Sequence, residues 1–493
     1  MSINPIKRLA GETAIYGLGT MVPRFLNYLL VPFYTIMIFN QSEYGQITVL
    51  YSWVALLLVL LTYGMETSFF RFVSKSDNAA DVFNTATTAL LVTSIVFILL
   101  VVVFTQPIAL IIDYPANKEY ILFIGLIIAI DAFTALPFAQ LRHQNKARRF
   151  STIRILSVLL TIAFNLIFLW VIPKIAGDRL IELPLYRSTS LVAFVFISNT
   201  LGSLVTLAML TPELSSFKIT INWPLLRKML AYGLPILVIS LTGMINEVAD
   251  KILLKYFLPD SSTAEAQLGI YSASYKLAII MMLFIQMFRY AAEPFFFAEA
   301  DKTDAKNIYS QVMTYFVIFC WIIFLGVMLF IDIFKYFIGP GFWAGLTIVP
   351  IILAAKLFLG VFYNLSVWYK LTNNTLYGAI IAIVGSLITI VLNVVWIPKY
   401  GYIGAAWANF ACYFVIMAIS FIWGRQVYRI DYQYKRIVLY SILAIVLYFG
   451  SMLFSNTPSN FHLLVNAFLF IGFVSTAYFI ESKKNGRVKK NVN

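Results

Sequence analysis

Long apolar stretches follow one another along almost the whole chain, with only short polar segments between them. A helix needs about 20 mostly apolar residues to cross a bilayer, and fourteen stretches approach that length. They begin near Gly11, Gln46, Val82, Tyr120, Thr152, Ser188, Leu230, Gly269, Ile308, Gly345, Leu376, Ile403, Ile437 and His462. Backbone groups in lipid must be satisfied within the spanning segment, which favours helices for runs of this length. The sequence therefore predicts an all-α polytopic membrane protein with about 14 transmembrane helices.

Composition supports the same class. Of the 493 residues, 61% are hydrophobic and only 12% are charged, and the mean hydropathy is +0.85. Soluble domains are about 25% charged. The first stretch follows Lys7 and Arg8, as in a signal peptide, but it continues to Phe39 without a small-residue cleavage site. We therefore expect it to persist as the first span.

Basic residues alternate between the two sides of the predicted membrane. If the N-terminus is cytoplasmic, the even-numbered spans end on the cytoplasmic side. The segments on that side then contain most of the Lys and Arg residues that lie outside the spans. The opposite side has only Lys118, Lys174, Arg179, Arg187, Lys335 and Lys399. Cytoplasmic loops normally hold this excess, so we expect both termini to be cytoplasmic. The net charge of +14 then reflects topology and anionic lipid, and we expect no nucleic-acid partner.

Two pairs of similar segments indicate an internal repeat. Gly45 matches Gly269, and the Ile-Pro-Lys ending at Lys174 matches that ending at Lys399. Chance matching of short apolar motifs is the alternative. The separations within the two pairs differ by a single position (269 − 45 against 399 − 174), which favours two pseudo-symmetric six-helix lobes related about the membrane normal. The expected organisation is an N-lobe over 1–211, a cytoplasmic interlobe linker over 212–229, a C-lobe over 230–430, helices 13 and 14 over 431–482, and a basic cytoplasmic tail over 483–493.

Charged residues interrupt several spans. An ionisable group at bilayer depth costs at least about 2.5–3.5 kcal/mol, so it normally faces protein or a water-filled cavity. Those nearest the span centres are Arg24, Asp131, Glu247 and Lys356. The others are Glu66, Arg154, Asp250, Lys251, Lys255, Lys276, Arg289 and Glu293. A chain that accommodates so many charges is expected to enclose a polar interior, as a transporter does.

Some of these charges have explanations that need no function. Glu247 and Lys251 lie four residues apart and could neutralise each other. Lys255 lies toward the outer end of its span, where its long side chain could reach water. The same explanation applies near cytoplasmic helix ends to Glu66, Arg154, Arg289 and Glu293.

Several chemistries are disfavoured by what the sequence lacks. It has no G-x-x-x-x-G-K-[ST] loop for a nucleotide, so we expect no internal ATP motor. His143 and His462 are far apart, and Cys320 and Cys412 lie in apolar spans, where a thiol acts as a small hydrophobe. No soluble segment is long enough for a catalytic domain. We therefore expect a protein that is not an enzyme and that needs no cofactor other than a coupling H⁺ or Na⁺.

Several segments resemble Wzx-type polysaccharide flippases of the multidrug/oligosaccharidyl-lipid/polysaccharide (MOP) superfamily. They are Gly17–Tyr34, Glu43–Gly45, the Asp250-Lys251 pair, Tyr271–Lys276 and Tyr400–Ala408. The resemblance extends over essentially the whole chain. It implies a MATE-like fold, with two six-helix lobes around a central cavity and two extra C-terminal helices.

The resemblance also implies a cargo and a location. The cargo would be a polyprenyl-diphosphate-linked oligosaccharide, the repeat unit of a lipopolysaccharide O-antigen, a capsule or an exopolysaccharide. Alternating access would move it across the bacterial cytoplasmic (inner) membrane. By analogy with the related lipid II flippase, the last two spans would form a groove for the lipid tail. Expected partners are this lipid-linked glycan, membrane lipids, a glycan polymerase and other polysaccharide assembly proteins.

Two hypotheses assign roles to the charges inside the spans. The first assigns the diphosphate and acidic sugars to Arg24, Lys251, Lys276, Arg289 and Lys356, because a diphosphate that leaves water needs cationic partners. The second assigns ion coupling, or ion pairs in the cavity, to Glu66, Asp131, Glu247 and Asp250.

Three alternatives stay open. A multidrug antiporter of the same superfamily is expected to have fewer cations in its cavity, because its substrates are cationic. A lipid II flippase would share the architecture. A membrane glycan polymerase or ligase would be an enzyme with a large outer loop, whereas the longest outer segment here, Pro173–Arg187, has about fifteen residues.

Overall fold

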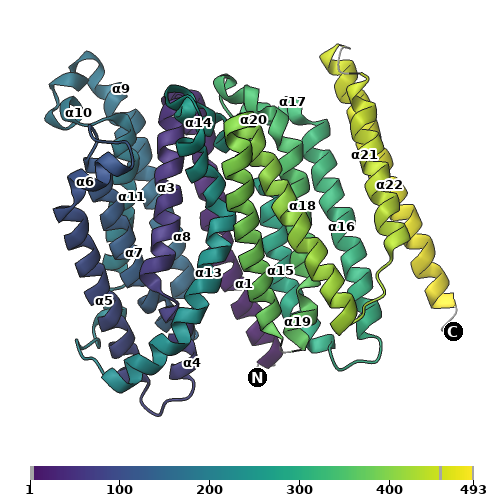
Figure 1. Ribbon diagram of the computed structural model, residues 1–493, viewed down its shortest axis with the longest axis horizontal. Coiled ribbons are helices and arrows are strands. Elements are labelled where there is room, and N and C mark those ends of the chain that lie inside the picture. Colours follow the sequence, from purple (N-terminus) through teal and green to yellow (C-terminus); the bar gives the residue numbers. More distant parts are fainter. Residues whose placement is uncertain (1–4, 373, 455–457, 491–493) are drawn as a thin grey trace. The chain divides into compact units, whose positions relative to one another are not determined.

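The computed structural model describes residues 5–372, 374–454 and 458–490, which form helices joined by short loops (Figure 1). Residues 1–4 of the predicted N-lobe and 491–493 of the predicted tail lie outside this range. In the first half the helices are α1 Pro5–Tyr28, α2 Leu30–Pro32, η1 Phe33–Ile38, α3 Gln41–Thr62, α4 Met65–Val73, α5 Ala79–Val103, α6 Thr105–Ile111, α7 Glu119–His143, α8 Ala147–Leu166, η2 Ile167–Val171, α9 Ile172–Ala176, η3 Gly177–Glu182, α10 Pro184–Ser188, α11 Leu191–Met209 and α12 Thr211–Leu214. In the second half they are α13 Trp223–Phe257, α14 Ser261–Leu277, α15 Ile279–Glu299, α16 Ala305–Leu329, α17 Ile331–Phe334, η4 Lys335–Phe337, η5 Pro340–Ile348, α18 Val349–Leu365, α19 Val367–Leu371, α20 Thr375–Val427, α21 Tyr434–Met452 and α22 Ser459–Lys490.

The number of spans agrees with the sequence. Among the described residues, 13 helical segments are long and apolar enough to cross a membrane. One of them, α20, has 53 residues and is interrupted at Gly401, whose φ of 58° and ψ of −141° are not helical. A positive φ is readily adopted only by glycine. Each part of α20 is itself long enough to span a bilayer, so the total of about 14 transmembrane helices is confirmed.

The chain divides into two compact units. The first contains Met1–Tyr256 and Asp260–Gly269, and the second contains Phe257–Pro259 and Ile270–Asn493. Helix α13 therefore packs within the first unit, although the expected C-lobe begins at Leu230. The reason is local packing, since Met229 of α13 is buried in a cluster with Phe69 of α4 and Val82 of α5. The hydroxyl of Ser68 also donates to the carbonyl of Met229 at 2.9 Å.

Helices α5 and α16 are local counterparts of each other in the two units. Both have 25 residues, and the separation of their first residues (305 − 79) is close to that of Gly45 and Gly269. Each is capped at its C-terminal end by a phenylalanine with similar backbone angles, Phe104 at φ −101° and Phe330 at φ −109°. Each is followed directly by a short helix, α6 or α17. This correspondence agrees with pseudo-symmetric halves.

A buried asparagine repeats in the same way. The Asn165 amide donates to the carbonyl of Thr161 at 2.8 Å, and the Asn393 amide donates to the carbonyl of Thr389 at 2.7 Å. Asn393 follows Asn165 by the same number of residues as Thr389 follows Thr161 (393 − 165 and 389 − 161). This number is close to the separation of Gly45 and Gly269. Both asparagines are fully buried. Buried amide N–H groups are costly unless hydrogen-bonded, and in both copies the NH₂ group is bonded to the carbonyl one turn earlier.

The last two helices, α21 and α22, lie side by side in the second unit (Figure 1). Toward the C-terminal end of α22, the Glu481 carboxylate accepts a hydrogen bond from the Tyr440 hydroxyl at 2.7 Å and forms an ion pair with Arg436. The indole of Trp321 donates to the hydroxyl of Ser441 at 2.9 Å, which connects α21 to α16. The predicted extra pair of helices is therefore attached to the second unit through specific polar contacts as well as apolar packing.

Candidate functional site

Arg24 lies on a polar face of α1. Thr20 and Asn27 share this face, since they are four and three residues away. Gly19 is on the other side of the helix, where it packs closely against Ser151 of α8. The Arg24 side chain is exposed. An exposed cation within a membrane-spanning helix needs water or a polar headgroup beside it. This face of α1 is therefore suited to line a hydrated space.

Asp131 occupies the interior of the first unit. It projects from α7, and its Oδ1 accepts a hydrogen bond at 2.7 Å from the hydroxyl of Ser203 on α11. Arg154 of α8 is its cationic neighbour, close enough to act on it electrostatically, and the Arg154 guanidinium stacks 3.8 Å from the Phe138 ring. Among the described residues, no Lys or Arg nitrogen lies within ion-pair distance of the Asp131 carboxylate.

The charges on α13 pair differently from what their spacing suggests. Lys251 Nζ lies 3.2 Å from Oδ1 of the neighbouring Asp250, and it donates to the backbone carbonyl of Glu247 at 2.8 Å. The alternative that Lys251 neutralises the Glu247 carboxylate is therefore wrong, because Asp250 is its carboxylate partner. Asp250 is buried, whereas the Glu247 side chain is exposed. This leaves Glu247 open to the surroundings and places the Asp250–Lys251 pair inside the unit.

Lys255, one turn further along α13, is also not the snorkelling residue expected. Its side chain is buried and donates at 2.8 Å to the carbonyl of Ile112. The Nζ atom lies 3.6 Å from the Glu265 carboxylate and 3.4 Å from the centre of the Tyr114 ring. Lys255 turns inward because three partners from other segments compensate its burial.

Glu66 and Arg142 form an ion pair between α4 and α7. The second unit has a similar pair, in which Lys370 Nζ of α19 lies 2.6 Å from the Glu293 carboxylate of α15. The separation of the two acids (293 − 66) and that of the two bases (370 − 142) are both close to that of the repeat. Arg289, which is half exposed, shares the Glu293 carboxylate at 3.0 Å. Glu66 and Arg289 are therefore both paired with residues of opposite charge.

Lys356 lies in the interior of the second unit, at the middle of α18. It is 2% exposed, and its Nζ lies 3.4 Å from the hydroxyl of Tyr413 on α20. The centres of the Tyr275 and Tyr413 rings are 5.0 and 4.9 Å from the same nitrogen, close enough for cation–π attraction. Lys276 of α14 follows Tyr275 directly and is half-buried.

The structure thus brings the predicted residues together in small groups. Within the first unit, Asp250 meets Lys251, and Glu66 meets Arg142. Within the second unit, Arg289 meets Glu293. The single cavity that these residues were predicted to share draws on both units and stays a prediction.

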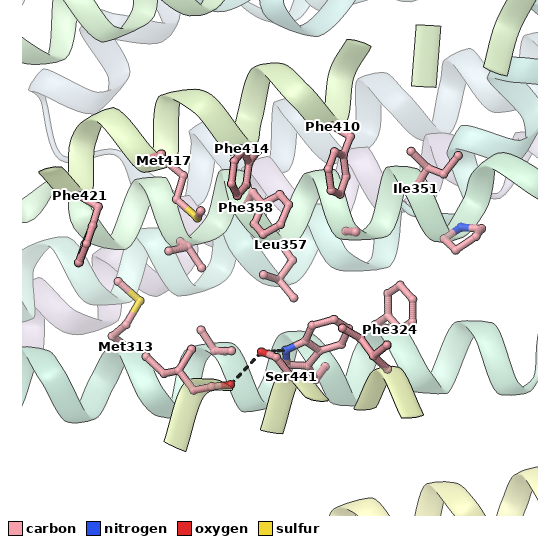
Figure 2. A pocket seen from close by; sticks show the side chains of 18 of the residues that line it. Met313, Phe324, Ile351, Leu357, Phe358, Phe410, Phe414, Met417, Phe421 and Ser441 are labelled. Atoms are coloured by element: carbon pink, nitrogen blue, oxygen red, sulfur yellow. Dashed lines mark hydrogen bonds between the residues drawn. The ribbon is translucent and has the colours of Figure 1, made fainter. Parts of the chain in front are cut away.

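An apolar groove lies in the second unit. It has a volume of about 890 Å³, and α16, α18, α20 and α21 contribute its walls. Figure 2 shows aromatic and aliphatic side chains along it, including Phe358, Phe410, Phe414 and Met417. We call this feature the α21 groove.

Ser441 and Trp321 are polar residues in the walls of the α21 groove, and they are hydrogen-bonded to each other. The hydroxyl of Ser441 accepts from Trp321 and donates to the carbonyl of Ile437 (Figure 2). Tyr432 lies at one end, between α20 and α21. Burial, with a smaller effect of neighbouring phenols, raises the pKa of Tyr432 well above its usual value, so this ring stays neutral at physiological pH. The groove therefore offers mainly carbon to an occupant.

Sequence reasoning missed several partners in these groups. Ser203, Tyr413 and Lys370 are ordinary residues of apolar spans or their ends, and no local pattern distinguishes them. Their roles follow from contacts between helices that lie far apart in sequence. The last two spans were expected to form a groove for the lipid tail. Helix α21 contributes one wall of the α21 groove, but its lining includes no described residue of α22, and its other walls were not assigned from the sequence.

Comparisons with known proteins agree with this architecture. The model of the polysaccharide biosynthesis protein family matches residues 9–298. No curated protein matches the chain by sequence. Among solved structures, the lipid II flippase MurJ in an inward closed conformation is 15% identical, with a TM-score of 0.73 over 94% of this chain and 99% of that chain. An inward-facing multidrug resistance MATE transporter of the MOP superfamily is 14% identical, with a TM-score of 0.60 over 86% of this chain and 98% of that chain. At these identities the likeness establishes a common fold.

Proposed function

Because the chain belongs to the polysaccharide biosynthesis protein family, with the fold of MOP-superfamily transporters, we propose that it is a lipid-linked oligosaccharide flippase. Its cargo is a polyprenyl-diphosphate-linked repeat unit of an O-antigen, a capsule or an exopolysaccharide. It moves the cargo across the bacterial cytoplasmic membrane by alternating access, and both of its termini are cytoplasmic. Glycan polymerase and other assembly proteins are its partners in the membrane.

The observation that carries this proposal is the α21 groove. A polyprenyl cargo has a long apolar tail that must stay in an apolar environment while its glycan crosses the membrane. Lipid is as apolar as the groove, so occupancy depends on close packing and not on the hydrophobic effect. Aromatic walls from α18 and α20 supply such packing surfaces (Figure 2). The groove also needs α21, a helix beyond the two six-helix halves.

The cations inside the spans support recognition of the diphosphate. Lys356 and Lys251 belong to the interiors of their units, and Arg24 lies on a polar face of α1. Charge-assisted hydrogen bonds to phosphate are stronger than neutral ones. We assign the diphosphate and acidic sugars to Arg24, Lys251, Lys276, Arg289 and Lys356. The pairing of Arg289 with Glu293 makes it the weakest member, because the ion pair must open before it can bind phosphate.

Ion coupling is assigned to Asp131 among the four acidic residues considered. Glu66 and Asp250 already have Arg142 and Lys251 as partners, and the Glu247 side chain is exposed. Asp131 is held inside the first unit by the neutral hydroxyl of Ser203. A carboxyl in such a setting can exchange a proton or bind a sodium ion without breaking an ion pair.

Two related functions use the same fold. The cargo of a lipid II flippase would have a polyprenyl tail of the same kind, so the α21 groove does not distinguish that function from the one we propose. A multidrug antiporter would carry cationic compounds, and the buried Lys356 disfavours them electrostatically. A glycan polymerase or ligase is disfavoured by the short outer segments.

Complementation tests the cargo. The chain would be expressed in a strain that lacks a known O-unit flippase, and the lipid-linked intermediates would be identified by mass spectrometry. We expect the accumulated intermediate to disappear and surface glycan to return. A strain depleted of its lipid II flippase is the matched control. Rescue of that strain alone would reassign the protein to lipid II, and rescue of neither strain, with the protein present in the membrane, would refute the proposed cargo class.

A further inference from the structure

The two ends of the α21 groove differ in the charge of their surroundings. Figure 2 shows Phe421 of α20 at one end, and Phe324 of α16 and Ile351 of α18 at the opposite end. Trp407 of α20 and Phe449 of α21 also line the opposite end. No charged residue lies within four positions in sequence of any of the four residues at that end. We call the other end, where Phe421 lies, the Phe421 end of the groove.

Basic residues lie at the Phe421 end. Tyr434, the first residue of α21, lines the groove there, and the centres of its ring and the Phe421 ring are 5.8 Å apart. Arg425 follows Phe421 by one turn of α20, and its guanidinium carbon is 6.0 Å from the centre of the Phe421 ring. Lys435 directly follows Tyr434, and both basic residues are exposed. Among the described residues, no carboxylate lies within ion-pair distance of Arg425 or Lys435.

Two carboxylates that are close to these cations in sequence have other partners. The Asp431 carboxylate is 3.0 Å from the Arg429 guanidinium, and the Glu481 carboxylate is paired with Arg436. The first turn of α21 contains no acidic residue, so the positive end of its helix dipole adds to the field of the cations. An anion at the Phe421 end is therefore attracted by Arg425 and Lys435 without displacing a carboxylate.

An apolar groove with one cationic end matches a lipid with an anionic head and an apolar tail. Arg and Lys form charge-assisted hydrogen bonds with phosphate oxygens, and close packing against the walls holds the tail. This arrangement fixes the direction of the lipid, with its head beside Arg425 and its tail pointing toward Phe324. Two separate cations favour a diphosphate, which has negative charge on both phosphates, over the single charge of a phospholipid diester.

We propose that the Phe421 end of the groove is a loading site for the diphosphate of the cargo, with Arg425 and Lys435 as its phosphate-binding residues. This inference rests on the proposed function, because the tail in the groove and the diphosphate at its end belong to one lipid-linked glycan. The topology from loop charge places this end on the cytoplasmic side, where the cargo starts. The site lies within the second unit and holds the cargo before its diphosphate leaves that side.

Binding of defined lipids tests the loading site. The full chain, in phosphatidylcholine nanodiscs, would be titrated with a long-chain polyprenyl diphosphate or with the uncharged polyprenol, and bound lipid would be counted by native mass spectrometry. R425Q/K435Q should weaken binding of the diphosphate about tenfold or more and leave binding of the polyprenol unchanged. R227Q/K228Q is the matched control, because it removes two exposed basic residues of α13 in the first unit. Equal affinity of R425Q/K435Q and wild-type protein for the diphosphate would overturn the proposal.

Competition distinguishes the cargo from ordinary anionic phospholipid. When phosphatidylglycerol replaces part of the phosphatidylcholine, the wild-type protein should keep its bound polyprenyl diphosphate and R425Q/K435Q should still bind it more weakly. Displacement of the polyprenyl diphosphate by phosphatidylglycerol would assign the site to bulk anionic lipid and overturn its assignment to the cargo.

Photochemical cross-linking tests the direction of the lipid. A polyprenyl diphosphate with a photoreactive group on its terminal phosphate should label the chain between Phe421 and Arg436. The same lipid with the photoreactive group at the end of its tail should label the segments around Phe324 and Ile351. The reverse pattern would show that the head does not lie at the Phe421 end.

Transport kinetics show whether the site acts in loading. In proteoliposomes, R425Q/K435Q should raise the half-saturating cargo concentration about tenfold and leave the maximal rate and the melting temperature unchanged. A lower maximal rate at an unchanged half-saturating concentration would contradict a loading role. A wrong cargo class would leave even the wild-type protein without bound polyprenyl diphosphate, and complementation would fail. A wrong loading site would leave binding and complementation by the wild-type protein intact, while R425Q/K435Q binds as tightly as the wild type.

Discussion

Replacing Asp131 with asparagine separates the charge of this residue from its shape. The Ser203 hydroxyl donates at 2.7 Å to Oδ1 of Asp131, and the asparagine carbonyl oxygen can accept the same hydrogen bond. The substitution therefore keeps the packing between α7 and α11. Removal of a buried negative charge also relieves a desolvation penalty. We expect the free energy of unfolding of D131N to stay within about 1 kcal/mol of the wild-type value.

The effect on transport is expected to be much larger. If Asp131 takes one cation across the membrane in each cycle, a potential of 100 mV contributes about 2.3 kcal/mol per cycle. Loss of this contribution corresponds to about a fiftyfold loss of gradient-driven transport at that potential. D131N should retain the slow exchange of cargo that needs no gradient, because the cation sites for the diphosphate are unchanged.

Proteoliposomes with an imposed pH gradient, sodium gradient or membrane potential provide the assay. Transport by wild-type protein should accelerate with one of the two ions, and D131N should lose this acceleration. S203A is the matched control, since it removes the hydrogen bond and keeps the carboxylate, and its transport should still respond to the gradient. An undiminished gradient response in D131N would show that the coupling group lies elsewhere.

Four other substitutions test three separate parts of the structure. K356M should lower glycan export about ten- to hundredfold, because a charge-assisted bond to phosphate is worth about 1.5–3 kcal/mol. Y413F should lower export less. A wild-type level of lipid-linked intermediates in K356M cells would exclude a role of Lys356 in cargo binding. A418W places an indole in the α21 groove. It should slow transport of long-tailed cargo about tenfold and leave transport of a short-tailed analogue unaffected. Equal slowing of both cargoes would show that the groove does not bind the lipid tail. E481Q weakens the hydrogen bond from Tyr440 and removes the ion pair with Arg436. It should destabilise the α21–α22 pair by about 1–2 kcal/mol and lower the melting temperature; an unchanged melting temperature would contradict this.

The positions of the spans could be predicted because hydropathy is a local property. The predicted start at Val82 lies within α5, which begins at Ala79, and the predicted start at Tyr120 is one residue after the beginning of α7. Even the division of α20 was expected, since separate spans were placed on either side of Gly401. The repeat added the correspondence between helices of the two halves, such as α5 and α16. These features depend on composition over about twenty residues and tolerate errors of a few positions.

The partners of individual charges could not be predicted in the same way. Spacing along α13 suggested Glu247 for Lys251, but the carboxylate partner is the adjacent Asp250. Lys255 was expected to reach outward, but the carbonyl of Ile112, 143 residues away, binds it inside the first unit. Asp131 depends on Ser203, 72 residues away. Helical spacing describes neighbours on one helix, whereas burial of a charge is decided by which helices pack together.

The most direct test of the account is translocation of a defined cargo by the purified protein. A polyprenyl-diphosphate oligosaccharide would be placed in one leaflet of proteoliposomes, and its appearance in the other leaflet would be followed with a glycan-modifying enzyme that cannot cross the membrane. We predict that wild-type protein moves this lipid-linked glycan and that K356M in matched vesicles does not. Transport of a cationic drug by the same vesicles, with the glycan lipid left in its original leaflet, would contradict the proposed function.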